Sequence, residues 1–323
     1  MATSQIQVRV RPTTSQRFFR RLRGGNEIAY TITFICAGSI LLVTSLLAYQ
    51  LWVASALSRH ASGWAFIWTS QWNPVTEQFG ALPFAYGTVV TSLLALLIAV
   101  PSGLMAAIFL AEMAPAKISD FLTFLIELLA AVPSVIIGVL GMYALAPVLE
   151  KSVVPVLKSV LGFLPIFSGP FYGSASVFSA GIVLAIMIVP FIVSVSREVL
   201  LSVPVEQREA ALGLGSTRWE STWQVVIPYA SRGIYGSIFL ALARALGETM
   251  AVTMVIGNTP QISKSLLAPG YSIAAVIANE FSEAPSATYQ AALIELGLVL
   301  FAITIIINGL ARLLMLTTQE TAK

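Results

Sequence analysis

The chain has 323 residues, of which 57% are hydrophobic and only 10% are charged, and its formal net charge is +3. Soluble domains carry about 25% charged residues, so this chain has too few to cover a globular protein in water. The composition therefore argues against a soluble enzyme, a disordered chain or a secreted scaffold. It favours an all-α membrane protein that crosses the bilayer several times.

Six stretches are long and apolar enough to cross a bilayer as helices, which takes about 20 residues each. In chain order they are Ile28–Val53, Phe84–Ala111, Phe121–Leu149, Ser176–Val199, Gly233–Gly257 and Ala291–Leu316. Their continuous apolar character differs from the alternation of barrel strands. The first stretch is too long for a signal-peptide core, so we expect an uncleaved first span.

Lysine and arginine residues are divided unevenly between the two sides of these spans. Thirteen lie on the side of the N-terminal tail and four on the other side. This asymmetry predicts a multi-pass protein of the plasma (inner) membrane with both termini in the cytoplasm. The basic tail is explained by topology and by attraction to anionic lipid, so we expect no nucleic-acid partner.

The spans and their connections suggest a division of the chain into regions. The expected regions are a basic cytoplasmic tail (1–27), a first span with its outer loop (28–83), a core of five spans (84–316) that includes a large inner loop (200–232), and a cytoplasmic C-terminal tail (317–323).

Residue types that serve catalysis or metal binding are scarce. Cys36 is the only cysteine and His60 the only histidine, so neither a disulfide framework nor a Cys/His metal site is expected. The chain has no Gly-x-x-x-x-Gly-Lys-Ser/Thr sequence to hold nucleotide phosphates. We therefore expect no catalytic residue, no metal and no cofactor bound by this chain.

The inner loop has the pattern of two short helices around a glycine turn. Gly213 and Gly215 are expected to end the first helix. Thr217 and Glu220 have the spacing of a capping box, which starts a second helix, and Pro228 is expected to end that helix.

The first of these helices has a face that another surface could approach closely. The small side chains of Ala210 and Ala211 do not obstruct such an approach. Polar groups around this face are provided by Arg208, Glu209 and Arg218. Such an element could simply cap the bundle, or it could dock a partner.

The inner loop resembles the EAA loop of ABC importer permeases. The shared pattern is Glu209-Ala210-Ala211, three residues, Gly215, nine residues, Val225, one residue and Ile227-Pro228. In that family the loop sits in a groove of the ATP-binding subunit. The resemblance implies that coupling to a separate ATPase is carried by Arg208, Glu209, Ala210, Ala211 and Gly215.

Arg244 lies within the fifth predicted span, where a charge costs about 2.5–3.5 kcal/mol and needs an explanation. Glu248 follows four residues later, which places both side chains on one face of a helix, where they can pair. The pair could serve only to fix helix packing. Alternatively, Arg244 offers its guanidinium donors to an oxyanion in a transport path. Glu248 would then orient the guanidinium and prevent it from holding the anion too tightly.

The sequence around Arg244, from Ala243 to Val252, resembles phosphate-specific permeases of the PstC type, as does Pro133-Ser134 followed by Gly138. The resemblance implies a type I ABC importer permease bundle (MetI-like) that carries phosphate. It also implies a PstA-type permease partner, a PstB-type ATPase dimer that binds ATP and Mg, and a PstS-type phosphate-binding protein.

Two other functions remain open at this point. The same machine could carry another oxyanion, such as sulfate, molybdate or a phosphonate. The chain could also be a proton-coupled secondary transporter in which Glu248 or Glu295 relays protons.

Overall fold

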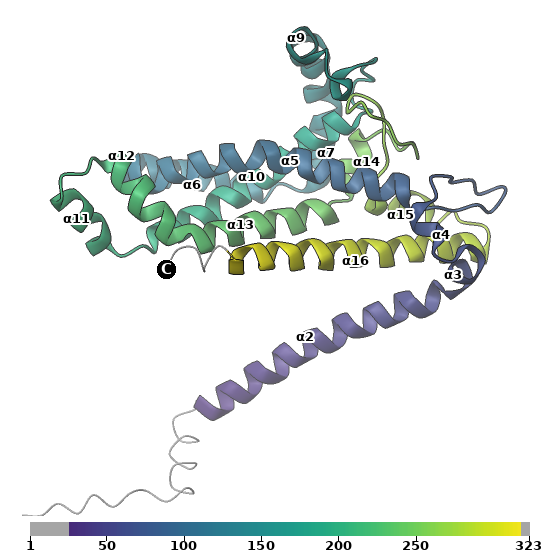
Figure 1. Ribbon diagram of the computed structural model, residues 1–323, viewed down its shortest axis with the longest axis horizontal. Coiled ribbons are helices and arrows are strands. Elements are labelled where there is room, and N and C mark those ends of the chain that lie inside the picture. Colours follow the sequence, from purple (N-terminus) through teal and green to yellow (C-terminus); the bar gives the residue numbers. More distant parts are fainter. Residues whose placement is uncertain (1–25, 318–323) are drawn as a thin grey trace, which may run out of the picture. The chain divides into compact units, whose positions relative to one another are not determined.

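The computed structural model describes residues 26–317, and their side chains from residue 29 to residue 313. The predicted tails, 1–27 and 317–323, therefore lie almost entirely outside the described residues. The chain divides into two compact units, residues 1–53 and 54–323. In its described part the first unit is one helix, α2 (Asn26–Ala54), whose mean hydropathy of 2.1 suits a membrane span (Figure 1).

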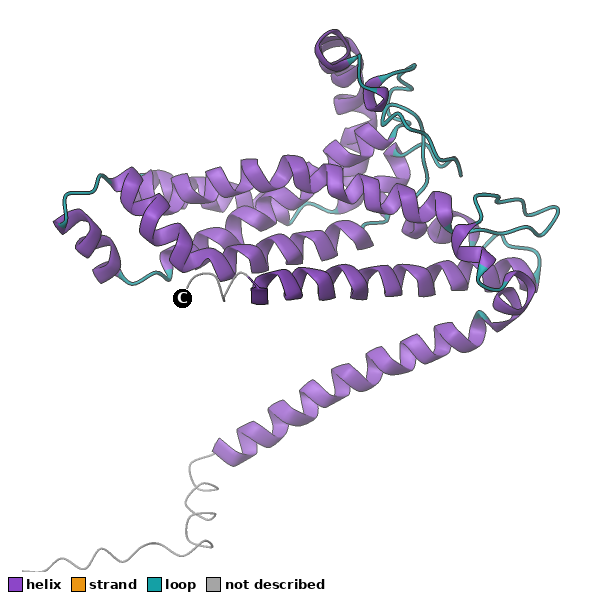
Figure 2. Cartoon of the chain, viewed as in Figure 1, coloured by secondary structure: helices purple, strands orange, loops and turns teal. Residues whose placement is uncertain are grey.

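The described part of the second unit consists of helices joined by loops, and the loop before α5 contains one isolated bridge between Asn73 and Gln78 (Figure 2). Its principal helices are α5 (Leu82–Ile108), α6 (Ala116–Ala130), α7 (Ser134–Leu140), α10 (Val177–Leu201), α13 (Ile227–Gly247) and α16 (Ala287–Thr317). Shorter helices are α3 (Ala56–Ser62), α4 (Ala65–Trp68), α8 (Ala146–Val148), α9 (Val154–Leu161), α11 (Val205–Gly213), α12 (Arg218–Ser221), α14 (Met250–Val255) and α15 (Ile273–Glu280). Four π-turns extend these helices: η1 (Phe109–Met113), η2 (Gly141–Leu145), η3 (Leu149–Val153) and η5 (Thr222–Val226).

Six helical stretches of the described chain are long and apolar enough to cross a membrane. They are Ala29–Ala54, Leu82–Met113, Ser134–Leu161, Val177–Leu201, Arg218–Gly247 and Ala287–Leu313. The predicted number of spans is confirmed, and the first, second, fourth and sixth lie close to their predicted bounds.

The predicted third span, 121–149, is wrong in its bounds because the helix is broken inside it. Residues 131–133 leave the helical ladder between α6 and α7, and Pro133 stands just before α7 with an extended backbone. Proline cannot donate to the ladder and disfavours the helical conformation at the residue before it. The membrane-length stretch therefore begins at Ser134 and runs through two π-turns to Leu161.

The predicted fifth span, 233–257, is also displaced. One continuous helical stretch runs from Arg218 to Gly247, and the chain breaks at residues 248–249 before α14. Hydropathy favoured the apolar residues of α14, but those residues form a separate short helix in the core. Ala251, Val252 and Val255 are all at most 2% exposed there.

Helix α10 lies at the centre of the second unit. Its most apolar stretch is 72% buried, against 28–33% for the other four spans of this unit. It packs along α5 and α13, and the hydroxyls of Ser196 and Ser237 hydrogen-bond across the α10–α13 contact at 2.8 Å. The less buried helices leave apolar faces exposed, as expected for helices that lie in a bilayer.

The end of α5 that lies opposite α11 and α12 is fixed by close packing with the segment before α15 (Figure 1). Thr88 Oγ1 accepts a hydrogen bond from the amide of Ile273 at 2.9 Å. Gly87 lies so close to the carbonyl of Tyr271 that a Cβ would stand 2.1 Å from its oxygen. Nearby, Glu280 accepts hydrogen bonds from the Trp72 indole at 3.0 Å and from the Tyr289 hydroxyl.

We predict that Gly87→Ala lowers the stability of the folded protein by about 1–3 kcal/mol, the usual cost of overpacking a filled site. The added methyl meets backbone atoms of Tyr271, which cannot rotate away. Gly236→Ala is the matched control, because nothing lies within 4 Å of the new methyl in α13. Thermal unfolding of the purified chain in detergent measures both, and equal midpoints would contradict the prediction.

Candidate functional site

The first helix of the inner loop, α11, ends in a glycine-dependent turn. Gly215 has a φ of +92°, which favours glycine. The amide of Gly215 donates to the Leu212 carbonyl at 3.0 Å, and the amide of Ser216 donates to the Ala211 carbonyl at 3.2 Å. These two bonds form a Schellman motif, which satisfies carbonyls at the helix end. The helix ends as predicted at this pair of glycines, with Gly213 still helical.

The second helix of the loop begins with the predicted capping box. The Thr217 hydroxyl accepts from the amide of Glu220 at 3.2 Å, and the Glu220 carboxylate accepts from the amide of Thr217 at 2.8 Å. The box therefore satisfies two amide groups at the start of α12.

Pro228 does not end this helix, so that prediction is wrong. The π-turn η5 lies directly before α13, and the helical stretch continues through Pro228 to Gly247. A π-turn shifts the carbonyl that the proline ring would otherwise meet and leaves the missing amide without consequence. The second helix of the loop is consequently the beginning of the fifth span, joined to it as one helical stretch.

Arg208 points into the bundle. Its Nη2 donates to the Leu200 carbonyl at 2.7 Å and to Glu112 Oε1 at 2.8 Å, and its Nη1 donates to the Val203 carbonyl. The side chain therefore holds α11 against the ends of α10 and α5.

The other residues of the EAA pattern face either the solvent-exposed side of α11 or the bundle. Glu209 and Ala210 are exposed, whereas Ala211 is only 7% exposed because it packs against the bundle. Leu212 and Leu214 are also exposed, Leu214 to 90%. The exposed face of α11 and its turn thus combines one carboxylate, a small residue and two leucines.

Arg244 lies in the last turn of α13, just before the break at residues 248–249. It is exposed, and it has no ion-pair or hydrogen-bond partner among the residues that the structure describes. Leu240 and Gly247, four residues before and three residues after Arg244 on the same helix face, are also exposed, so the guanidinium projects away from the core of this chain.

The predicted ion pair between Arg244 and Glu248 is wrong. Helix α13 ends at Gly247, and Glu248 has an extended backbone with φ −69° and ψ 126°. The two side chains therefore do not share a helix face. Glu248 Oε1 instead accepts a hydrogen bond from the amide of Ala251 at 3.3 Å, at the start of α14.

The helices that follow the two breaks pack against each other. Helices α7 and α14 are in contact, and Gly138 makes the approach possible, since a Cβ there would lie 3.0 Å from the Ala251 Cα. Glu127, exposed one turn before the first break, matches the position of Arg244 before the second. Broken helices within a membrane bundle are tolerated where they face protein or a water-filled cavity, and transporters place substrate sites there.

Sequence reasoning missed Glu112, the partner of Arg208. The two residues are 96 positions apart, and only the excess of polar residues at the end of the second span could have drawn attention to it. Gly138 was noted for its resemblance to permeases, but its packing against α14 depends on a contact between distant segments.

Metal ligands do not gather in this structure. Across residues 26–317, no group of three His, Cys, Asp or Glu side chains is close enough to hold a metal ion. Glu295, the other carboxylate considered for proton relay, is 5% exposed in α16 and lies beside Ser58 and Arg59 of α3.

A bundle of membrane-length helices, broken at two adjacent places and carrying a polar helical loop at one end, defines a multi-pass membrane transport subunit. Residues 99–316 match the family model described as binding-protein-dependent transport system inner membrane component.

Named relatives are similar over nearly the whole chain. The phosphate transport system permease protein PstC of Mesorhizobium japonicum is 45% identical over 301 residues, which are 92% of each chain. PstC of Pasteurella multocida is 48% identical over 80% of this chain and 81% of its own. The chain therefore belongs to the family of binding-protein-dependent transport system inner membrane components, and within it to the PstC permeases. The prediction of a transport subunit rather than an enzyme is confirmed.

A solved structure of the MetNI methionine ABC transporter also matches, with a TM-score of 0.47 and 17% identity over 70% of this chain and 90% of that chain.

We predict that Gly215→Ala destabilises the turn between α11 and α12, because an L-residue at this φ costs about 1 kcal/mol. The fraction of molecules in which the turn is locally unfolded should rise about fivefold. Trypsin cleavage after the exposed Arg218 should accelerate accordingly. Gly213→Ala is the control, since Gly213 is helical and has nothing within 4 Å of a new methyl. Equal cleavage rates for the two variants would show that the turn does not depend on the left-handed glycine.

Proposed function

We propose that this chain forms the phosphate path of an ATP-driven importer and couples it to a separate ATPase subunit. The relatives are named phosphate transport permeases, which supports phosphate as the substrate. The observation that carries the mechanism is the exposed guanidinium of Arg244 beside a helix break, with no partner among residues 29–313.

The energetics of Arg244 favour a transport path over a lipid-facing position. A guanidinium facing lipid costs about 2.5–3.5 kcal/mol even on the lenient scale. Arg244 projects from α13 away from this chain's own core. A path between this subunit and a second permease subunit gives the side chain water, and gives phosphate a planar set of donors.

Glu248 has a supporting role in this proposal. Its carboxylate is held at the start of α14 by the amide of Ala251, so it lies at the break and is not neutralised by Arg244. A fixed negative charge near the path opposes tight binding of a phosphate anion. Transport needs binding that is strong enough to admit the ion and weak enough to release it.

The coupling loop provides the contact with the motor protein. Glu209, Ala210 and Gly215 lie on or beside the exposed face of α11, whereas Arg208 and Ala211 position that face from behind. A displacement of the loop acts directly on the helix that starts at Arg218 and carries Arg244.

The assembly that fits this role has four kinds of subunit. A PstA-type permease completes the path, a PstB-type ATPase dimer binds ATP and Mg and grips the coupling loops, and a PstS-type protein delivers phosphate from outside. ATP binding draws the two loops together and opens the cavity outward, and hydrolysis resets it. Both termini and the coupling loop lie in the cytoplasm, consistent with the excess of lysine and arginine on that side.

We predict that Arg244→Ala lowers phosphate uptake by about a hundredfold, because loss of a charged partner costs about 2–5 kcal/mol. Uptake of labelled phosphate by cells or by vesicles containing the complete complex measures it. Arg244→Lys should retain part of the activity, since an ammonium keeps the charge but loses the planar fork.

Arg312→Ala is the matched control, because Arg312 is an exposed arginine near the end of α16. It should transport normally. Uptake at the wild-type rate in an assembled Arg244→Ala complex would refute the assignment. Competition by sulfate, molybdate or phosphonate that equals competition by phosphate would refute the substrate.

We predict that Glu209→Lys weakens binding of the ATPase by about tenfold, or about 1.4 kcal/mol, because it reverses the charge on the exposed face of α11. Copurification and ATPase assays measure binding and coupling. Glu283→Lys makes the same charge change at an exposed site in the segment between α15 and α16 and should have no effect. Unchanged binding and coupling in Glu209→Lys would indicate that the loop only caps the bundle.

A further inference from the structure

Glu112 holds the coupling loop from inside the bundle. It lies in η1, the π-turn that ends α5, and both of its carboxylate oxygens lie 3.3 Å from Arg208 Nε. Oε1 also accepts from Arg208 Nη2 at 2.8 Å. The two side chains are only 10% and 19% exposed. The geometry is that of a charge-assisted pair with little screening by water.

The same π-turn is held from a second side. The Leu110 carbonyl accepts a hydrogen bond from the Ser119 hydroxyl at 2.8 Å, and the Ser119 oxygen accepts from Arg197 Nη2 at 3.2 Å. Two arginines, one on α10 and one on α11, therefore fix the inner end of α5. A π-turn is a rare irregularity that is frequent at functional sites.

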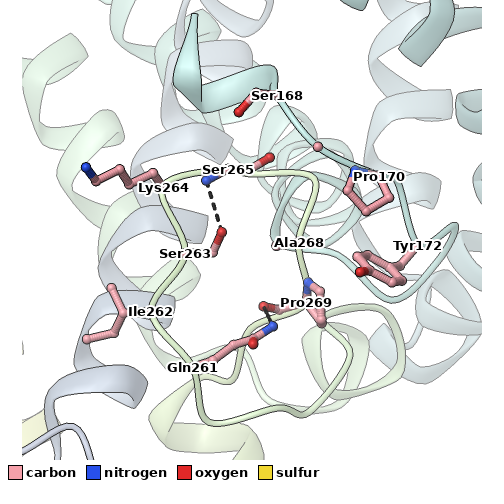
Figure 3. A pocket seen from close by; sticks show the side chains of 11 residues that line it. Ser168, Pro170, Tyr172, Gln261, Ile262, Ser263, Lys264, Ser265, Ala268 and Pro269 are labelled. Carbon is pink, nitrogen blue, oxygen red and sulfur yellow. Dashed lines mark hydrogen bonds between the residues drawn. The ribbon is translucent and has the colours of Figure 1, made fainter.

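The outer end of α5 is joined to the outer loops. Besides the Thr88 and Gly87 contacts, the hydroxyl of Tyr86 donates to the Ser263 carbonyl at 2.6 Å. Ser263 lines a pocket of about 520 Å³ between residues 168–172 and 261–269 (Figure 3). Helix α5 is 27 residues long, so it links two sites about 40 Å apart along its axis.

We propose that α5 transmits motion of the coupling loop to the outer mouth, and that Glu112 is the positioning residue that connects it to the loop through Arg208. The covalent chain already joins the loop to α10 and α13. Glu112 adds a noncovalent connection to a third helix, whose far end is hydrogen-bonded to the rim of the pocket. This inference rests on the proposed function, because it assumes that an ATPase moves the loop.

A merely structural pair would stabilise α11 without affecting the outer pocket. The two roles therefore differ in a measurable way. If α5 transmits motion, nucleotide binding at the inner side changes the accessibility of the pocket, and this change depends on Glu112 and on Tyr86. If the pair only stabilises α11, Tyr86 has no influence on the response.

The test uses the complete complex, with Cys36→Ser and Ile262→Cys in this chain. Ile262 lines the pocket and is 45% exposed. Labelling by a membrane-impermeant maleimide is compared with and without a non-hydrolysable ATP analogue. We expect the analogue to change the labelling rate by about fivefold or more, the lower range of allosteric coupling.

Glu112→Gln should abolish the response of the pocket and raise the ATP hydrolysed per phosphate transported. The exchange Glu112→Arg with Arg208→Glu should restore both, because it restores the ion pair. Tyr86→Phe should abolish the labelling response while ATPase binding stays intact. If the Glu112→Gln complex fails to assemble, Tyr86→Phe alone tests the proposal. Phe171→Tyr, a change beside the pocket that leaves α5 unaltered, should keep the response.

A wild-type response in Tyr86→Phe or in an assembled Glu112→Gln complex would overturn the proposal, as would failure of the exchange to restore it. Absence of any nucleotide response in the otherwise unaltered complex would also overturn it. The labelling does not depend on which anion is carried. Failure of phosphate uptake in the unaltered complex would contradict the proposed function separately.

Discussion

The hydrocarbon core of a bilayer offers no hydrogen bonds, so every backbone group there must find its partner within protein or in a water-filled cavity. The two helix breaks, at 131–133 and 248–249, are therefore the features on which the interpretation of the bundle depends. They are brought together by the contact of α7 with α14 at Gly138. A pair of breaks facing lipid would be costly, whereas a pair facing a path is the usual way to bring polar groups to a substrate.

The continuity of the helix through Pro228 connects the loop with Arg244. The π-turn η5 absorbs the proline, so α12 and α13 form one stretch from the capping box to Arg244. Behind it, Arg208 secures α11 to the inner ends of α10 and α5. The loop is thus attached to three helices, which suits an element that converts a partner's motion into rearrangement of a bundle.

Much of this could be predicted from the sequence, where the cause is local. Long apolar runs gave the number of spans, and spacing gave the capping box at Thr217 and the glycine turn at Gly215. Hydropathy failed at the third and fifth spans, because it counts apolar side chains and is blind to interruptions of the hydrogen-bond ladder. The assumed pairing of Arg244 with Glu248 failed for the same reason. The Glu112–Arg208 pair joins residues 96 positions apart, and no local pattern encodes it.

The central place of α10 has a consequence for biogenesis. Its most apolar stretch is 72% buried in the finished subunit, yet two of the helices that pack against it, α13 and α14, are synthesised later. During translation this helix must remain beside lipid or the insertion machinery until they emerge. Its high mean hydropathy of 2.6 makes contact with lipid favourable during that time. The same apolar surface therefore first favours insertion into the membrane and afterwards forms the interior of the subunit.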